Sequence, residues 1–316
     1  MREIIISECI NLLKTHNFIV SKPLGRSCFD ILACRDDVKL ILKILKNIDS
    51  ISREQSIELK KICRVLSAVP LIIGVRTRNA PMERGIVYDR YNIKSVTLET
   101  LKDFLEGSPP IIYAYRGGCF VKIDGETLKR VREERGISAG KLAEMVGVSR
   151  KAIYKYETYS ANPSVEVAMK IEECLDAPLV RGIDLFEPIE DENDKNIEED
   201  KPLDDYKQEI INIFNSLGFK SFVFEKAPFD ALEEGKEKKK NIILLTNIEE
   251  RANEDVEQRA LIVKELSKLI NGFSVLILKK KEKEYKNIPV ISTKELEKMD
   301  DVNDLLEYLK MFYFKT

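Results

Sequence analysis

Three cationic side chains, Arg150, Lys151 and Lys155, are the residues whose types and spacing point most directly to a chemical role. They follow Ser149, whose hydroxyl can cap a helix that begins at the next residue. From such a helix, Arg can make a bidentate contact to the edge of a guanine, and Lys can make a simpler contact to a base. Within a DNA-binding unit, a helix with these residues at its start can therefore meet base edges.

The segment around these residues, 128–175, predicts four short helices, of which the middle two form a helix-turn-helix. Ser138 can cap the second helix, Gly147 allows a tight turn, and Ser149 can cap the third. In such a unit the third helix, here about residues 149–156, lies in the major groove of DNA. The apolar residues have the three-to-four spacing of small packed helices: Leu128, Val131, Leu142, Ala143, Val146, Val148, Ile153, Tyr156, Val167, Ile171 and Leu175.

Residues 142–157 carry the pattern LA-x3-GVS-x3-I-x2-YE, and Pro163-Ser164 follows. With this pattern the segment resembles the DNA-binding domain of the Cro and phage-repressor family. The alternative is a compact helical bundle, but a bundle needs Leu and Ala rather than GVS followed by YE. The resemblance implies that the following residues bind DNA: Ser138, Lys141, Ser149, Arg150, Lys151, Tyr154 and Lys155.

Two positions depart from that family. The residue that opens its second helix is often a Gln that touches phosphate, and here it is Ala139. The family usually has Gly two residues after the Glu of YE, and here that residue is Tyr159. We expect one weaker phosphate contact and a differently shaped loop after the reading helix, but neither change removes the helix itself.

The composition is that of a soluble globular protein, with 44% apolar residues, 34% charged residues and a net charge of −2. No apolar run approaches the ~20 residues of a membrane-spanning helix, and the N-terminus lacks a signal-peptide cleavage pattern. Six Cys without a CxxC pair and a single His leave little for a zinc site. Phosphate-binding loops are absent as well. We therefore expect a cytoplasmic protein with no metal, no cofactor and no membrane partner.

The charge is unevenly distributed along the chain, and this suggests the domain boundaries. Residues 1–118 contain 19 Lys and Arg against 13 Asp and Glu, residues 119–185 contain 11 against 11, and residues 186–316 contain 22 against 30. The acidic run within 186–205 is nearly devoid of apolar residues, so it predicts a solvated linker. A DNA mimic that competes for a basic surface is the alternative. The expected domains are 1–118, the DNA-binding 119–185 and 206–316.

The segments on the two sides of the helix-turn-helix match each other in order and spacing, which suggests an internal duplication. Each copy is expected to run helix, strand, strand, helix, strand, strand, helix, which gives an α/β domain. The matching segments include 10–13 with 211–214, 17–18 with 218–219, 29–32 with 229–232, and 97–101 with 292–296.

The layout of each copy resembles the core of the PD-(D/E)xK nucleases. The N-terminal copy matches that motif at Asp30, Lys43 and Gln55, but Ile41 stands where the second acid belongs. A metal-dependent nuclease needs hard oxygen ligands to hold Mg²⁺ at the scissile phosphate. One carboxylate beside an Ile is a poor ligand set, although Asp36, Asp37 or Asp49 could substitute from a loop.

The C-terminal copy keeps Asp230 and Gln258, but Ile243 and Leu245 stand at the expected places of the acid and the Lys. In both copies the Asp can instead serve a structural purpose at the end of a strand. We therefore favour two inactive nuclease-like domains over an active nuclease.

The whole arrangement resembles a family of archaeal transcriptional regulators with a central Cro-type domain. We predict a sequence-specific regulator that binds double-stranded DNA as a homodimer, because one helix-turn-helix covers only a half-site. The first alternative is a metal-dependent DNA endonuclease that the helix-turn-helix directs to its target. The second is an interaction scaffold that no longer reads DNA. The sequence names no effector ligand.

Overall fold

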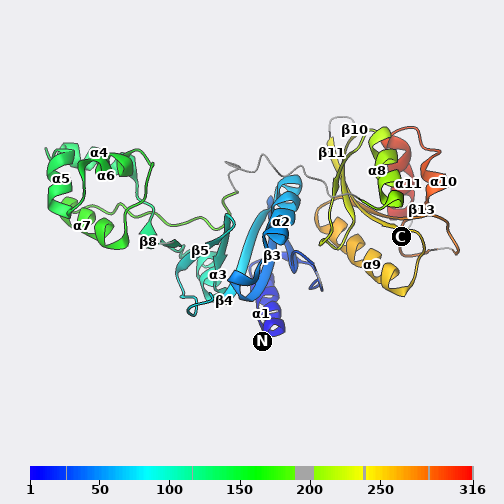
Figure 1. Ribbon diagram of the computed structural model, residues 1–316, viewed down its shortest axis with the longest axis horizontal. Helices are drawn as coiled ribbons and strands as arrows, with labels where there is room; N and C mark the ends of the chain where they lie inside the picture. Colours follow the sequence, from blue (N-terminus) through cyan, green and yellow to red (C-terminus); the bar gives the residue numbers. More distant parts are fainter. Residues whose placement is uncertain (26, 116, 189–202, 238–239, 284, 315–316) are drawn as a thin grey trace. The chain divides into compact units, whose positions relative to one another are not determined.

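The computed structural model describes residues 1–25, 27–115, 117–188, 203–237, 240–283 and 285–314 (Figure 1). Most of the expected acidic linker, 189–202, lies outside the described residues. The chain divides into two compact units. Met1–Ile5, Ile44–Ile51 and Leu71–Glu187 form the first unit, and Ile6–Lys43, Ser52–Pro70 and Pro188–Thr316 form the second. Among the described residues, no helix is both long and apolar enough to cross a membrane.

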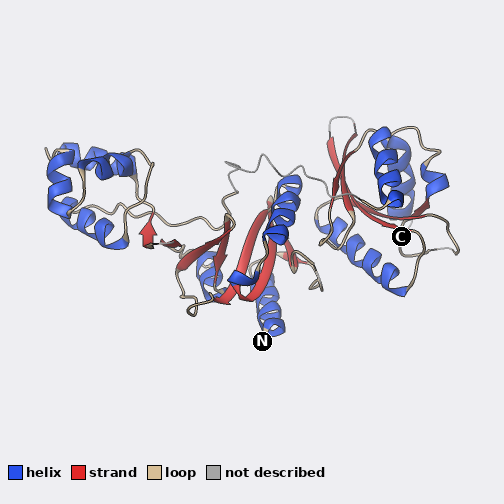
Figure 2. Cartoon of the chain, viewed as in Figure 1, coloured by secondary structure: helices blue, strands red, loops and turns tan. Residues whose placement is uncertain are grey.

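The N-terminal part of the chain builds an eight-stranded sheet in the order β1-β2-β3-β4-β6-β5-β7-β8 (Figure 2). Its main helix, α2, begins with a capping box between Ser52 and Gln55 and buries Leu59, Ile62 and Leu66 at helical spacing. The elements are α1 (Arg2–Thr15), β1 (Ile19–Val20), β2 (Ile31–Arg35), β3 (Val38–Asn47), the short helix η1 (Ile48–Ser50), α2 (Arg53–Leu66), β4 (Val69–Arg76), β5 (Ile86–Arg90), β6 (Ile93–Val96), α3 (Leu98–Leu105), β7 (Ile112–Tyr115) and β8 (Gly118–Val121).

The C-terminal part builds a five-stranded sheet in the order β13-β12-β11-β10-β9. One face of this sheet packs on α8 and α11, which bury Phe214 and Leu305, and the other face packs on α9 through Ala260 (Figure 1). The elements are α8 (Asp205–Ser216), β9 (Lys220–Val223), β10 (Ala231–Glu237), β11 (Lys240–Glu249), α9 (Glu254–Leu269), β12 (Phe273–Leu278), β13 (Val290–Ser292), α10 (Thr293–Leu296) and α11 (Val302–Phe314).

The two parts are copies of one fold. The strand order β1-β2-β3-β4-β6 recurs as β9-β10-β11-β12-β13, with the first two pairings antiparallel in both copies. The parallel pairing of Ile72 with Ser95 recurs as that of Leu276 with Val290. The predicted fold class, two copies of an α/β domain that flank a helix-turn-helix in the sequence, is therefore confirmed.

The equivalent aspartates make the same backbone hydrogen bonds. The N–H of Asp30 donates to the carbonyl of Leu42 at 2.8 Å, and the N–H of Asp230 donates to that of Thr246 at 2.9 Å. Asn17 and Gly218, which the sequence had aligned, both have a left-handed backbone with φ of 65° and 98° at the end of the first helix. The alignment of these segments is thus correct at single-residue level.

The expected number of strands is wrong in both copies. Each copy begins its sheet with a short extra strand, β1 or β9, which the sequence analysis did not identify. β1 has two residues and β9 has four, too few for the alternation of apolar and polar residues to be recognised. After the second helix, the N-terminal copy has three strands, β4, β5 and β6, where two were expected. The described residues of the C-terminal copy have the expected two there, β12 and β13.

The central helical bundle contains the four predicted helices, α4 (Gly125–Glu134), α5 (Ala139–Val146), α6 (Arg150–Glu157) and α7 (Val165–Leu175). Its core is formed by Leu128, Leu142, Ile153 and Ile171 with Val121 of β8. The apolar spacing seen in the sequence therefore corresponds to a single core that the bundle shares with the end of the sheet.

One acidic side chain, Glu233, lies inside the C-terminal copy. It is fully buried, opposite Leu244 on β11 and Ser221 on β9. Neither carboxylate oxygen has a hydrogen bond of good geometry among the described residues, and neither has the Ser221 hydroxyl. Burial raises the pKa of Glu233 to about 8, an effect that the Ser221 hydroxyl partly opposes. The carboxyl is therefore protonated in the folded protein at neutral pH.

We expect Glu233→Gln to flatten the dependence of stability on pH. An unfolded Glu releases its proton near pH 4.5, whereas the folded one keeps it until about pH 8. The stability associated with this proton is complete below pH 4.5 and is lost as pH rises toward 8. Thermal unfolding of the full chain between pH 5 and 8 measures this slope.

Glu234→Gln is the matched control, since Glu234 is the next residue on β10 but is only half-buried. It should leave the slope of stability against pH unchanged. If Glu233→Gln also leaves the slope unchanged, the Glu233 carboxyl is not a protonated core group.

Candidate nucleic-acid interface

The turn between α5 and α6 is fixed by the residues that the sequence predicted. The Ser138 hydroxyl accepts the N–H of Lys141 at 3.1 Å, and the Ser149 hydroxyl accepts the N–H of Ala152 at 3.1 Å. Gly147 has the left-handed φ of 74° that ends α5. Both serines therefore cap helices, as predicted, and their position at the helix N-termini is suited to a phosphate.

The start of α6 presents an exposed cationic face. Arg150, Lys151 and Lys155 are exposed, and none of them forms an ion pair with a described residue. Tyr154 is also exposed, with 65% of its surface accessible, whereas Ile153 points into the core. Because residues four apart share a helix face, Arg150 lies beside Tyr154 and Lys151 beside Lys155. The structure thus brings these four predicted residues together.

Lys141 lies on the preceding helix and is already paired in the absence of DNA. Its ammonium is 3.1 Å from the carboxylate of Glu144, one turn along α5, and both side chains are exposed. An exposed pair of this kind is worth only about 0–1 kcal/mol, so it can be exchanged for a phosphate contact at little cost.

A buried ion pair fixes α6 against α4. The Arg132 guanidinium donates to both carboxylate oxygens of Glu157 at 2.6 and 3.3 Å, and it also donates to the carbonyl of Ile137 at 2.9 Å. The two side chains are 9% and 7% exposed. The hydrogen bond to Glu157 raises the pKa of Arg132. Glu157 is part of the YE signature in the sequence, but no local pattern marks Arg132 as its partner.

A close backbone approach fixes the other side of the same helix end. A side chain at Gly125, the first residue of α4, would come within 2.6 Å of the carbonyl oxygen of Tyr156 and 2.7 Å of that of Glu157. Only glycine fits there, so α4 and the last turn of α6 touch through their backbones.

Tyr159 stands where the family usually has a glycine, and side-chain hydrogen bonds hold it in place. Its φ is 57°, the left-handed conformation that a glycine would adopt. Its hydroxyl donates to Asp124 at 3.3 Å and accepts the N–H of Glu126 at 3.3 Å. These side-chain hydrogen bonds hold the strained left-handed backbone, and the differently shaped loop stays a prediction.

The segment after α7 ties the bundle to the sheet within the first unit. Arg181 pairs with Asp124, and the N–H of Ile183 donates to the carbonyl of Pro110 at 2.7 Å. Glu187 then lies 3.4 Å from both Lys94 and Lys122. The N–H of Thr127 and the Arg181 guanidinium hold the pKa of Asp124 far below its usual range, so this anchor is ionised throughout the neutral range.

The nuclease-like motif of the N-terminal copy is only partly assembled. Asp30 and Lys43 lie together as predicted, 3.3 Å apart, and both are buried. The Lys43 ammonium also donates to the carbonyl of Ser27 at 2.6 Å. Gln55 does not join them, because its side chain accepts the N–H of Ser52 in the α2 capping box. Ile41 is fully buried opposite Leu32.

The residues present do not suit the metal that a PD-(D/E)xK nuclease would use. The partner of Asp30 is a cation, and the next position along β3 on the same face offers only the hydrocarbon of Ile41. Within the described residues, no group of three or more His, Cys, Asp or Glu side chains could hold a metal ion. No reaction step through a metal follows from this arrangement.

In the C-terminal copy, two cationic side chains surround the equivalent aspartate, Asp230. The Asp230 carboxylate pairs with Lys207 and Arg259, each at 2.9 Å, and accepts the N–H of Ile248 at 2.9 Å. Gln258, which the sequence had matched to Gln55, is exposed, and its neighbour Arg259 reaches the aspartate instead.

The positions assigned to the missing acid and Lys in this copy need correction. Strand register places Asn247 at the position of Lys43 and Leu245 at the position of Ile41, rather than Leu245 and Ile243. The Asn247 amide donates to the carbonyl of Pro228 at 3.1 Å, just as Lys43 donates to that of Ser27. The error arose because the hairpin after the aspartate is longer in this copy. β10 has seven residues and β2 has five, and Asp230 bonds to Thr246 whereas Asp30 bonds to Leu42.

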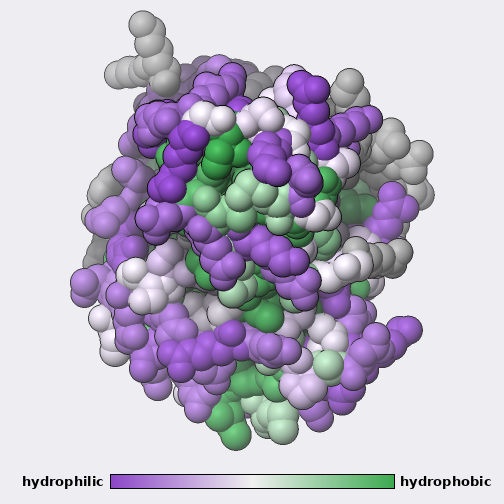
Figure 3. Space-filling view, turned by 90° about the vertical axis from the view of Figure 1, so that its left-hand side faces the viewer, coloured by the Kyte–Doolittle hydropathy of each residue, from purple (hydrophilic) through white to green (hydrophobic). Residues whose placement is uncertain are grey.

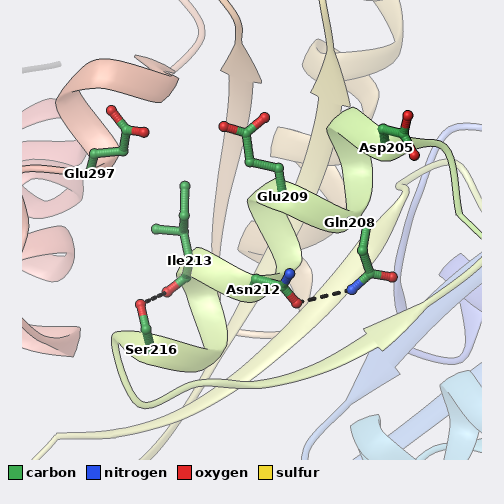
Figure 4. A pocket seen from close by; sticks show the side chains of 7 residues that line it. All are labelled: Asp205, Gln208, Glu209, Asn212, Ile213, Ser216 and Glu297. Atoms are coloured by element: carbon green, nitrogen blue, oxygen red, sulfur yellow. Dashed lines mark hydrogen bonds between the residues drawn. The ribbon is translucent and has the colours of Figure 1, made fainter.

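A depression of about 500 Å³ on α8 lacks the charge of a nucleic-acid site (Figure 4). It is lined by three carboxylates, Asp205, Glu209 and Glu297, and by no basic residue. Gln208 and Asn212 lie on the same face of α8. The Gln208 amide donates a hydrogen bond to the side-chain oxygen of Asn212 at 3.0 Å. These acids repel phosphate, so this depression is not a candidate interface for nucleic acid.

Two family models match the chain. One, a PD-(D/E)XK superfamily domain, matches residues 2–110, and the other, a helix-turn-helix, matches residues 128–181. The first covers the N-terminal copy, and the second covers the helical bundle from within α4 to Arg181. Both resemblances seen in the sequence are therefore confirmed.

Relatives match over nearly the whole length of the chain. A protein of Methanocaldococcus jannaschii is 68% identical and covers 98% of this chain and 97% of its own. Proteins of Methanococcus vannielii and Pyrococcus horikoshii are 51% and 38% identical, and cover 98% and 92% of this chain and 98% and 91% of their own. Each is named as a candidate HTH-type transcriptional regulatory protein.

We expect Glu157→Leu to destabilise the bundle by about 3–5 kcal/mol, because it leaves the Arg132 guanidinium buried without its carboxylate. Chemical denaturation of the full chain, followed at the bundle's transition, measures the loss. Glu133→Ala is the matched control, since Glu133 is 57% exposed and lies 3.3 Å from the same guanidinium. It should cost less than about 1 kcal/mol. Equal losses in the two variants would contradict a special role for the buried pair.

Proposed function

This chain belongs to the family of HTH-type transcriptional regulatory proteins, and from that premise we propose that it reads a specific sequence of double-stranded DNA with α6. The observation that carries the proposal is the exposed cationic start of α6, with Arg150, Lys151 and Lys155 free of ion pairs with described residues. The fold excludes neither activation nor repression. A regulator that binds chromosomal DNA would act in the cytoplasm.

We propose separate roles for the residues around the turn. Arg150 reads a guanine through a bidentate contact, and Lys151 and Lys155 make simpler base or phosphate contacts. Tyr154 lies on the same exposed face and packs against the groove. Ser138, Lys141 and Ser149, at the N-termini of α5 and α6, contact phosphates and fix the register of the reading helix.

We further propose that two chains bind together. A single helix-turn-helix covers one half-site, and paired half-sites lie about one helical turn of DNA apart. The face drawn in Figure 3 is largely hydrophilic with apolar patches. Met145 on α5 and Met169 on α7 are about half exposed and offer apolar contact for a second chain. In this division of labour, residues 119–185 bind DNA, and 1–118 and 206–316 have supporting roles.

The retained Asp30–Lys43 pair makes an endonuclease the competing function. We propose that the chain does not hydrolyse DNA. Hydrolysis in this fold needs at least two convergent carboxylates for the metal, and the Asp30 carboxylate is instead paired with the Lys43 ammonium, 3.3 Å away.

Arg150→Ala should reduce affinity for the preferred DNA site by about 1–3 kcal/mol and relax one base preference. The site is first obtained by selecting bound fragments from genomic DNA, and affinity is then measured by fluorescence anisotropy at several salt concentrations. Lys141→Ala should weaken all sequences alike and reduce the salt slope by about 1.

Lys170→Ala is the matched control for both variants, since Lys170 is an exposed lysine of α7 outside the proposed interface. It should leave affinity and sequence preference unchanged. An unchanged preferred sequence in Arg150→Ala would mean that α6 is not the reading helix.

The nuclease alternative predicts metal-dependent nicking of supercoiled DNA. We expect no cleavage above background with Mg²⁺ or Mn²⁺, and we expect Asp30→Asn to bind the selected DNA site as well as the unchanged protein does. Gel analysis of supercoiled plasmid and the same anisotropy assay measure the two outcomes. Nicking that Asp30→Asn abolishes would establish the enzyme and overturn the regulator-only proposal.

A further inference from the structure

The C-terminal copy contacts the N-terminal copy inside the second unit. The Glu58 carboxylate on α2 accepts the backbone N–H groups of Glu225 at 2.9 Å and Lys226 at 2.8 Å. The N–H of Cys28 donates to the carbonyl of Lys226 at 2.6 Å. Cys28 is fully buried, and burial raises the pKa of its thiol to about 12. The loop after β9 is therefore held by α2 and by the loop that leads to Asp30.

Two further contacts join the helix of each copy to the loop of the other. The Lys61 ammonium on α2 donates to the carbonyl of Val223 at 3.3 Å and lies 5.4 Å from the centre of the Phe224 ring. In the opposite direction, the Glu265 carboxylate on α9 pairs with Lys22 at 2.7 Å.

These two contacts occupy equivalent positions in the two copies. α2 and α9 are followed by left-handed residues at Ser67 and Asn271, and this equivalence aligns Lys61 with Glu265. Strand register aligns Val20 with Ser221, because each pairs with the third residue of the following strand, and it thereby aligns Lys22 with Val223.

The pairing is therefore reciprocal. Position 61 of one copy meets position 223 of the other, and the equivalents of those positions, 265 and 22, meet each other. Reciprocal contact between the same two patches defines the interface of a twofold-symmetric homodimer. A chance contact between two domains of one chain does not require this relationship.

We propose that the two α/β copies of one chain pair as the subunits of a homodimer would, with the surface of α2 and residues 22–28 as the docking site for the C-terminal copy. The partner that this surface fits is a second copy of the same fold, which the chain supplies itself. The surface is then occupied, so any second chain on DNA must bind elsewhere. The proposal does not depend on which DNA sequence α6 reads.

The docking site has a direct readout in backbone hydrogen exchange. The backbone N–H groups of Glu225 and Lys226 donate to the Glu58 carboxylate, and that of Cys28 donates to the carbonyl of Lys226. If the copies pair in solution, these loop amides exchange slowly although both loops lie outside helices and strands. Glu58→Ala should accelerate exchange in 223–228 by about tenfold or more, while α2 itself stays protected.

Hydrogen exchange by mass spectrometry on the full chain is the measurement, with Glu8→Ala as the matched control on α1. Glu8 is exposed, and its substitution should change neither loop. A second variant avoids the risk that Glu58→Ala unfolds the domain: Lys22→Glu should loosen the docking, and Lys22→Glu with Glu265→Lys should restore it.

Fast exchange of 223–228 in the unchanged protein would overturn the proposal, as would loop exchange that Glu58→Ala leaves unaltered. Protection that grows with protein concentration would show that the docking occurs between chains and would overturn the pairing within one chain. Slow exchange that is independent of concentration and is lost in Glu58→Ala supports it.

Discussion

The buried ion pair between Arg132 and Glu157 is the interaction on which the position of α6 depends. α6 has eight residues and buries a single side chain, Ile153, so its own core contact is small. The Arg132 guanidinium adds the contacts that fix this short helix. Its hydrogen bonds join the end of α6 to α4 and to the turn before α5. The close approach at Gly125 removes the remaining freedom. With its last turn fixed, the helix can leave its first turn exposed to solvent.

A buried acid paired with a cation is also found in the two nuclease-like copies. Both copies have an aspartate directly before the second strand of the copy, β2 or β10. Its backbone N–H donates to the following strand, β3 or β11, in each copy. A buried carboxylate needs a positive neighbour, and here lysine or arginine provides it. The aspartate of each copy thus has a structural role, in backbone hydrogen bonds and in an ion pair.

The sequence was sufficient for the helix-turn-helix, because caps, turn glycine and apolar spacing are local features. Ser138, Gly147 and Ser149 have the roles that their residue types predicted. It was also sufficient for the duplication, since Asn17 with Gly218 and Asp30 with Asp230 mark positions with special backbone requirements. The sequence was not sufficient for residues whose roles depend on pairing between separate strands or helices.

Asn247, Arg132 and Arg259 show this limit. Each is defined by a partner far along the chain, at Pro228, Glu157 and Asp230 respectively, and no local pattern marks the pair. β1 was not predicted for another reason: its two residues are too few to show the alternation of apolar and polar side chains that marks a strand. The cationic face of α6, by contrast, follows from helical spacing alone.

Asp124 joins two segments of the first unit that are far apart in the sequence. Its carboxylate caps α4, receives the Tyr159 hydroxyl from the loop after α6, and pairs with Arg181 beyond α7. Only the first of these bonds is needed for a helix to begin. In the course of evolution, positions 159 and 181 can therefore change singly while 124 is retained. Drift in this family should reach the tyrosine and the arginine before it reaches the aspartate.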